Sequence, residues 1–307
     1  MALPVWAWLG FLSLVTAMLA LDLGVFHRTS HVVKPREAGI WTAVWVAISL
    51  LFAGVVYLWL GSEPAVNFLT AYVLEKSLAI DNIFVFILIF AYFKVPPQYQ
   101  HRVLVWGVIG AVLMRAAMIF LGVALIERFE WILYIFGAFL LFTGVKMLFG
   151  SDDEEQDFNR NPVVKLARKV FRVSPEYDGE RFFTIKDGVR YATPLFLALL
   201  VIEVSDVVFA VDSIPAVFAV TTDPFIVFTS NILAILGLRS MYFLLAAVID
   251  RFVYLEIGLA FVLSYIGLKM ILMNFVHIPP LLSLAVVLGI LTASIVLSLL
   301  KTRTAAQ

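Results

Sequence analysis

The sequence predicts an all-α polytopic membrane protein with about nine transmembrane helices and an inverted three-helix repeat. The composition is 63% hydrophobic and 14% charged, with a mean hydropathy of +1.00, which is too apolar for a soluble globular domain. Apolar runs of about 20 residues, the length that crosses a bilayer, recur along the chain. A motif that extends over three of these runs occurs twice. We therefore expect residues 1–307 to form a single transmembrane domain.

Dividing the chain into spans of about 20 residues yields nine expected helices. We expect the first to be retained, because the N-terminus lacks the basic region and the small-residue cleavage site of a signal peptide. The segment at 150–190 is the only sizeable polar loop. The expected spans are 4–26, 39–60, 65–93, 103–126, 130–149, 191–220, 224–248, 253–273 and 280–300.

Lysine and arginine residues determine the expected orientation, because they are concentrated in cytoplasmic loops. Placing the N-terminus outside puts 16 basic residues in cytoplasmic segments, whereas one, Arg128, lies on the other side. Eight of the 16 lie in the loop at 150–190. We therefore expect this loop and the C-terminus to be cytoplasmic.

The cytoplasmic loop begins with an acidic cluster, at 151–157, and becomes basic through KLARKVFR. The favoured interpretation is a solvated linker with a helix on the lipid headgroups. A cytoplasmic cation sensor is the alternative, although the spacing lacks the glycine and the distal glutamate of an EF-hand. The acids of the cluster are Asp152, Asp153, Glu154, Glu155 and Asp157.

Two copies of one motif indicate an internal repeat. EKSLAIDNI at 75–83 aligns without a gap with DVVFAVDSI at 206–214, and basic residues further along align as well. Each copy contains three spans, an odd number, so the second copy enters the membrane from the opposite side, as in many secondary transporters. The first repeat is 65–149 and the second 191–273; chance similarity of short motifs is the alternative. The matched pairs are Glu75 with Asp206, Asp81 with Asp212, Asn82 with Ser213, Arg115 with Arg239, and Lys146 with Lys269.

Five acidic residues lie within the expected spans, where each ionised side chain costs about 2.5 kcal/mol or more and therefore indicates a functional site. The chain has no cysteine, and its four histidines fall in loops or at span ends. Only oxygen ligands remain, which suit manganese, magnesium or calcium better than zinc or copper. The candidate metal ligands are Glu75, Asp81, Glu203, Asp206 and Asp212, with Asn82, Ser213 and Asn231 as additional polar ligands.

Three basic residues lie at the same depth as the five acids, namely Lys76, Arg115 and Arg239. The resulting charge of minus two would suit one divalent cation or two protons. We interpret Arg115 and Arg239 as structural counter-ions that hold the repeats together, with a direct transport role as the alternative. A buried ion-pair network without any ligand is the alternative for the acids. Asp22 is a weaker candidate, because it lies near a span end.

Pro215 predicts a local break in the helix that carries Asp206 and Asp212. It cannot donate a hydrogen bond to Val211, so we expect the sixth span to bend or unwind just after Asp212. Such a break would bring Asp206 and Asp212 to a common centre. We also expect Asp81 and Asp212 to approach each other near the middle of the membrane.

Several stretches resemble the TerC family of bacterial integral membrane proteins, particularly its Alx-like branch. They include EKSLAIDNIFVF, VLVWGVIGAVLMR, ILYIFGAFLLFTGVKM, VIEVSDVVFAVDSIPAVFAVTTDPF and ILGLRSMYFLLA. The resemblance covers nearly the whole chain and implies a multi-pass protein of the bacterial inner membrane. It also implies manganese export, with resistance to tellurium ions and an alkaline-pH response in some members. The family's acidic positions correspond to the five candidate ligands named above.

The expected function is therefore a divalent-cation exporter, most of all for manganese, that works by alternating access. One or more of the carboxylates could also exchange protons. The alternative is a non-transporting membrane partner that metallates or stabilises exported proteins. A membrane redox enzyme is poorly supported, since the sequence has neither cysteine nor a nucleotide motif. We expect no enzymatic activity, no permanently bound cofactor and no nucleic-acid partner; the oligomeric state stays open.

Overall fold

The computed structural model describes residues 4–26, 35–129, 131–149, 162–186, 188–246, 254–276 and 278–305, and these residues are mostly helical. The described helices are α1 (Val5–Phe26), α2 (Pro35–Leu60), α3 (Ser62–Tyr92), α4 (Pro97–Arg128), α5 (Ile132–Phe149), α6 (Pro162–Val170), α7 (Pro194–Phe218), α8 (Pro224–Leu236), α9 (Leu238–Leu245), α10 (Leu255–Ile271) and α11 (Pro280–Ala305). Two short strands, β1 (Phe183–Lys186) and β2 (Val189–Ala192), form an antiparallel hairpin.

Five of the described helices are long and apolar enough to cross a membrane, namely α2, α4, α5, α7 and the 280–301 part of α11. The count is six if the bent pair α8 and α9 forms one span. The apolar part of α1, Val5–Ala20, is shorter. Every expected span contains a helix, but nine crossings stay a prediction.

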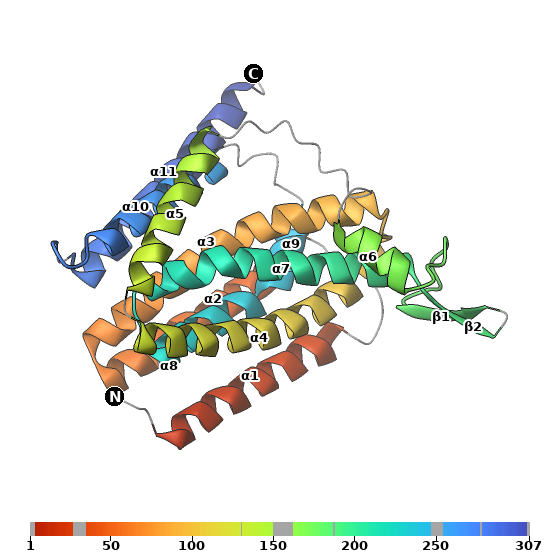
Figure 1. The fold of residues 1–307 in the computed structure, drawn as a ribbon, viewed down its shortest axis with the longest axis horizontal. Coiled ribbons are helices and arrows are strands. Elements are labelled where there is room, and N and C mark those ends of the chain that lie inside the picture. The colour runs from red at the N-terminus through yellow and green to blue at the C-terminus, as the bar shows by residue number, and fades with distance from the viewer. Residues whose placement is uncertain are drawn as a thin grey trace.

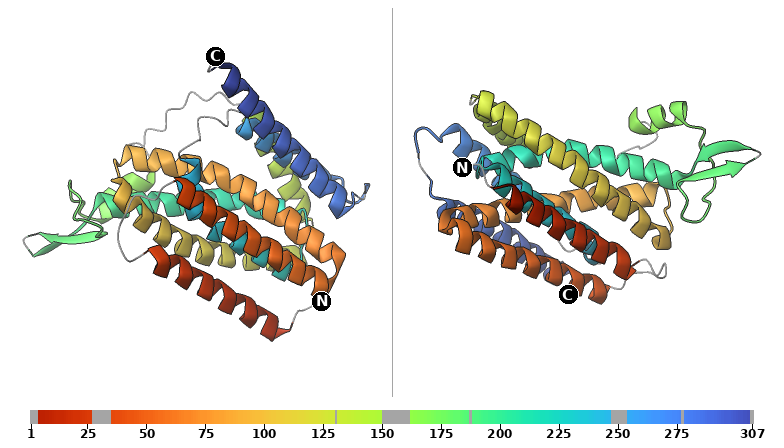
Figure 2. Two further views of the ribbon diagram at one scale, coloured as in Figure 1. Left: turned by 180° about the vertical axis from the view of Figure 1, so that it is seen from behind. Right: turned by 90° about the horizontal axis from the view of Figure 1, so that it is seen from below.

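The helices form one bundle with an inclined group at one end. In Figure 1, α3, α4 and α7 run along the long axis, whereas α5, α10 and α11 lie together and cross it. Figure 2 shows the same division from behind, with the β1–β2 hairpin projecting beyond the opposite end. The carboxyl end of α3, the start of α4 and the start of α7 therefore share one end of the bundle with the hairpin.

The most buried helices are those that carry charges or polar groups. All side chains of α8 from Phe225 to Leu236 are buried, and α3 is packed against α2, α7, α8 and α11. The outer helices instead expose large apolar side chains, such as Leu58 at 85% and Phe142 at 67%. This distribution is the one expected in a bilayer, where lipid covers apolar surface and polar groups are kept inside the bundle.

The expected break after Asp212 is not present. The helix α7 continues through Pro215 to Phe218. Pro215 lies in the last turn, so the helix needs to continue for only three residues beyond it, and the Pro215 carbonyl accepts a bond from Ala219 N at 3.0 Å. The interruption occurs instead at Gly237, where α8 and α9 meet at 43°.

The loop at 150–190 contains a helix, as expected, and also a β-hairpin that the sequence did not lead us to expect. Its described part contains α6 and the hairpin, which turns at Gly188 with φ of +74°, a conformation that glycine adopts without strain. The Tyr177 hydroxyl donates to the Phe93 carbonyl at 2.7 Å and so ties the loop to the end of α3. Burial raises the pKa of Tyr177 to about 12, so this donor stays protonated at neutral pH. The acidic cluster at 151–157 lies outside the described residues.

Two glycines allow α5 and α10 to pack closely. A Cβ at Gly144 would lie 2.7 Å from the Ala260 oxygen and from the Ser264 nitrogen. A Cβ at Gly267 would lie 2.6 Å from the Gly137 oxygen and 2.5 Å from the Leu141 nitrogen. Since these neighbours are backbone atoms, neither position has room for a larger side chain.

Candidate functional site

Arg115 of α4 lies at the centre of a buried polar network. Its guanidinium donates to both oxygens of Asp206, at 3.1 and 3.0 Å. The Nη1 atom donates to Glu75 Oε2 at 2.7 Å and to Ser213 Oγ at 3.3 Å. The side chains of Arg115 and Glu75 are each 2% exposed, and that of Asp206 is 5% exposed. One arginine therefore joins the acids that the two aligned motifs place at matching positions.

Helix geometry explains why these residues meet. Glu75 and Asn82 are seven residues apart on α3, which is two helical turns, so both lie on the same face. Asp206 and Ser213 have the same spacing on α7. Both faces point into the bundle, and Arg115 reaches them from α4. The sequence does contain a signal for this arrangement, because the spacing of seven is present in both copies of the motif, whereas the predicted site was built on the spacing of six between the acids.

Two asparagine side chains complete the network. Asn82 Nδ2 donates to Asp206 Oδ1 at 3.3 Å, and Asn231 Nδ2, from α8, donates to Glu75 Oε1 at 2.6 Å. A carboxylate only accepts, so each amide must direct its nitrogen toward the acid and its oxygen away. Both amide oxygens are buried without a hydrogen-bond partner among the described residues. They are therefore two acceptor atoms that no described residue uses.

A small cavity adjoins the network on one side. It has a volume of about 10 Å³ and is lined by Asp206 and by apolar residues that include Phe86, Leu104 and Ile235. This volume is close to the space that one water molecule needs. Among the described residues that line it, Asp206 is the only charged one. The cavity therefore has room for one water molecule or one dehydrated small ion, and it is too small for a cation that keeps a hydration shell.

Glu203 lies outside the network, one turn before Asp206. Its carboxylate occupies the space where a Cβ at Gly110 of α4 would be. Gly107 similarly admits the Ile202 side chain, whose Cγ2 would lie 3.3 Å from a Cβ at that position. Small residues such as these let helices approach each other closely in membranes. Glu203 makes no hydrogen bond or ion pair with any described residue, and it is only partly buried.

The remaining predicted ligands are not all brought together. Asp212 is partly buried and has no hydrogen bond or ion pair among the described residues. The side chains of Asp81 and Asp22 lie outside the described part, so the expected approach of Asp81 to Asp212 stays a prediction. Within the described ranges, no three His, Cys, Asp or Glu side chains form a group that could hold a metal ion.

The two matched arginines occupy different surroundings. Arg239, in the first turn of α9, lies with Nη1 3.3 Å from His101 Nε2 at the start of α4. Both arginines are buried, at 2% exposure each. Arg115 is therefore the counter-ion in this structure for Glu75 and Asp206, whereas Arg239 is near the end of the bundle that carries the hairpin.

Lys76 has a structural partner that the sequence did not reveal. Its amine donates to the Ala234 carbonyl at 3.0 Å. This carbonyl belongs to the last turn of α8, beside the interruption at Gly237, where helix geometry leaves oxygens without partners. Lys76 thus stabilises the bent junction of α8 and α9. It is not a counter-ion of the acids in the network.

Comparison with known proteins places these features in a family. A family model described as "Integral membrane protein TerC family" matches residues 60–306. A Myxococcus xanthus protein named an uncharacterized membrane protein is 54% identical over 96% of this chain and 92% of its own length. An Escherichia coli K12 protein named "Putative membrane-bound redox modulator Alx" is 51% identical over 95% of this chain and 93% of its own length. No solved structure matches the chain.

Proposed function

The chain belongs to the TerC family of integral membrane proteins, and from this premise we propose that it is a secondary transporter that exports divalent cations, manganese above all, from the cytoplasm. The site would consist of Glu75 and Asp206, with Asn82 and Asn231 contributing their free oxygens. Asp81, Glu203 and Asp212 would line the route to and from it.

One observation carries the proposal, namely the charge imbalance around Arg115. The guanidinium neutralises one of the two carboxylates that it binds, which leaves a formal charge of minus one in an interior site. A purely structural ion pair would be balanced, because an uncompensated buried charge is strongly destabilising. An acceptor-rich site with excess negative charge is suited to a cation, and the proton or metal ion would supply the missing charge.

The ligand atoms favour a hard cation. Carboxylate and amide oxygens suit manganese, magnesium and calcium, and neither sulfur nor an imidazole lies in the network. The preference for manganese among these three comes from the family resemblance. Binding would require one carboxylate to leave Arg115, so loading of the cation and release of the arginine are coupled in this scheme.

Alternating access between two inverted repeats is supported by how α5 and α10 pack. The neighbours of Gly144 are Ala260 and Ser264, and those of Gly267 are Gly137 and Leu141. The alignment of Lys146 with Lys269 also aligns Gly144 with Gly267, Gly137 with Ala260, and Leu141 with Ser264. Exchanging the copies therefore converts one set of contacts into the other, as a two-fold axis would. The pairings of α3 with α8 and of α7 with α4 have the same relationship.

The test is manganese flux into liposomes that contain the purified protein. Glu75→Gln removes one charge from the network, whereas Glu63→Gln makes the same change on the same helix at an exposed position. We expect wild type and Glu63→Gln to show equal manganese flux and Glu75→Gln to lose at least ten-fold, since about 1.4 kcal/mol of lost stabilisation already has that effect. The melting temperature of each variant in detergent shows whether it is folded.

Two outcomes would contradict the proposal. Wild-type vesicles without manganese flux beyond empty vesicles would favour the alternative, a non-transporting membrane partner that metallates or stabilises exported proteins. Wild-type flux in a folded Glu75→Gln variant would keep transport but reject the site. The redox role in the relatives' names cannot depend on thiols of this chain, because it contains no cysteine.

A further inference from the structure

The short helix α6 lies in the loop at 150–190, apart from the proposed cation site. We propose that the outer face of α6, together with Arg172, binds anionic phospholipid headgroups at the membrane surface beside the bundle. Lipid binding by α6 would not depend on the transported ion. It rests on the charges, the apolar surface and the position of this helix.

The basic residues of α6 differ from those of the hairpin in having no partner among the described residues. In the hairpin region, Lys186 pairs with Glu176 at 3.1 Å and Arg181 with Asp178 at 3.4 Å. Around α6, no residue that the structure describes forms an ion pair with the basic side chains, and these side chains are exposed. The residues concerned are Lys165, Arg168, Lys169 and Arg172. Four exposed cations in eight residues, unpaired within the described part of the chain, form a surface that attracts anions.

The same helix has two apolar faces. Val164 and Ala167 are 1% and 3% exposed and attach α6 to the bundle, where it packs against α7. Leu166 and Val170, one turn apart, are 64% and 65% exposed on another face. An apolar stripe beside lysine and arginine is typical of helices that lie in the membrane interface, with the apolar side chains among the acyl chains.

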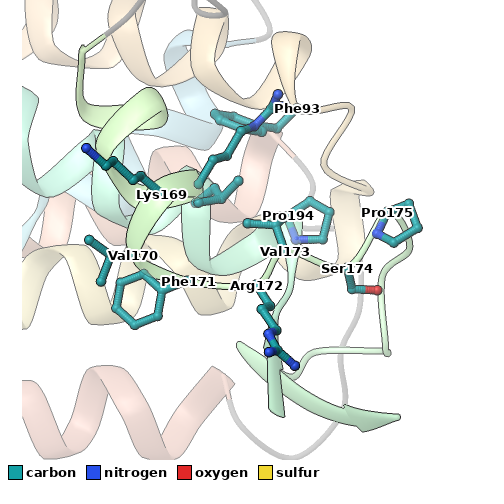
Figure 3. Close-up of a pocket in the computed structure, with 11 residues that line it drawn as sticks. Phe93, Lys169, Val170, Phe171, Arg172, Val173, Ser174, Pro175 and Pro194 are labelled. Carbon is teal, nitrogen blue, oxygen red and sulfur yellow. The ribbon is translucent and has the colours of Figure 1, made fainter. Parts of the chain in front are cut away.

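A surface hollow beside α6 has the position and size to accommodate a headgroup. Its volume is about 670 Å³, within the range of about 300–1,000 Å³ found for small-molecule sites. The walls are formed by α6, the segment that follows it, Phe93 at the end of α3, and Pro194 and Leu197 at the start of α7. Figure 3 shows Lys169 and Arg172 on this segment, with Phe93 and Pro194 beside it. The hollow therefore joins the cytoplasmic ends of the two helices that carry Glu75 and Asp206.

The arrangement of the charges favours a membrane surface over a single free anion. In Figure 3, the side chains of Lys169 and Arg172 point in different directions instead of converging. In this arrangement one phosphate ion does not contact both groups at once, whereas a leaflet presents many phosphates side by side. The exposed Leu166 and Val170 also have no role in binding a free anion. Both features match a lipid surface with negative charge.

The experiment uses the absence of cysteine from the chain. A cysteine at Val170, labelled with a polarity-sensitive fluorophore, reports whether α6 enters lipid. Ile185→Cys in β1 is the control, since Ile185 is equally apolar and 73% exposed. The full-length labelled proteins are placed in nanodiscs of phosphatidylcholine, with or without equimolar phosphatidylglycerol. We expect a blue shift and quenching by lipid-borne quenchers at position 170 in the anionic discs, and no change at position 185.

Charge variants then test whether the basic residues of α6 recognise the anionic lipid. R168Q/K169Q/R172Q should weaken the preference for phosphatidylglycerol about five-fold per residue, or about 100-fold in total. R181Q/K186Q/R190Q removes three basic residues from the hairpin region and should retain the preference. The proposal is overturned if the α6 variant keeps the full blue shift. It is also overturned if inorganic phosphate in pure phosphatidylcholine discs reproduces the shift, which would identify a free-anion site.

Discussion

At the residue scale, the network around Arg115 is better explained by a function than by a contribution to stability. Its side chain donates four hydrogen bonds to three residues on two other helices. Replacing such a buried ionic network by apolar side chains often leaves stability unchanged or higher. A protein that only needed to fold would therefore gain little from Glu75, Asp206 and Arg115 together. The proposed cation, which would exchange with the arginine, accounts for their presence in the interior.

Arg115→Lys tests how far the guanidinium geometry matters. Lysine keeps the charge but cannot hold both Asp206 oxygens and Glu75 at the same time. We expect a loss of about 1.5–3 kcal/mol for each charge-assisted hydrogen bond that is not replaced, measured as a lower melting temperature in detergent. Arg128→Lys, at the exposed end of the same helix, is the control and should melt like wild type. A similar melting temperature for both variants would show that a point charge suffices.

At the element scale, the packing contacts between helices limit which segments can move. The helices α5 and α10 meet through glycines whose neighbours are backbone atoms, so this contact behaves as a rigid joint between the proposed repeats. The interruption between α8 and α9 is different. Lys76 donates to the Ala234 carbonyl there, and α9 packs against α2 and α4, so several contacts fix the described place where a span changes direction.

Gly144→Ala and Gly267→Ala test the two-fold relation of α5 and α10. Each added methyl group would meet backbone atoms at 2.7 Å or less, and overpacking of this kind costs about 1–3 kcal/mol. If the contact has two-fold symmetry, the two variants should lower the melting temperature by similar amounts. Gly289→Ala on α11 has open space around it and should leave stability unchanged or slightly higher. Two very different losses would contradict the symmetry.

At the scale of the whole molecule, the shape indicates an orientation that can be measured. The hairpin, α6 and the ends of α3 and α7 gather at one end of the bundle (Figures 1 and 2). We propose that this end is cytoplasmic, because it carries most of the basic residues. The connection between α4 and α5, which includes Trp131, would then face outward.

Single cysteines at Trp131 and Ile185 test this orientation in the cysteine-free chain. Both residues are exposed, at 58% and 73%. In intact spheroplasts, we expect a membrane-impermeant maleimide to label Trp131→Cys but not Ile185→Cys. After the membranes are opened, both should react. Labelling of Ile185→Cys alone in intact spheroplasts would reverse the orientation, and with it the direction of transport.

Much of the architecture follows from local sequence patterns. The apolar runs are located by composition alone, and the helices of the structure lie in all nine of the expected spans. The match to the family model confirms the resemblance drawn from the paired acidic motifs. The candidate site could be predicted only in part from these patterns. Glu75, Asp206, Asn82, Ser213, Asn231 and Arg115 do meet. The spacing of seven in both motifs indicates a shared helix face, but it does not tell which partner each residue binds or that Glu203 lies apart.

The spans could be predicted and the contacts of the site could not, for a physical reason. Whether a segment can cross a bilayer depends on its own transfer free energy, so the sequence by itself determined the apolar spans, the unusual acids and the paired motif. Which acid binds which base depends on how helices far apart in the chain are packed. The tertiary structure therefore decided that Arg115 joins Glu75 to Asp206 while Lys76 supports α8. It also decided that α7 stays helical at Pro215 and that the chain bends at Gly237 instead, because helix breaks occur where neighbouring groups can satisfy the freed backbone.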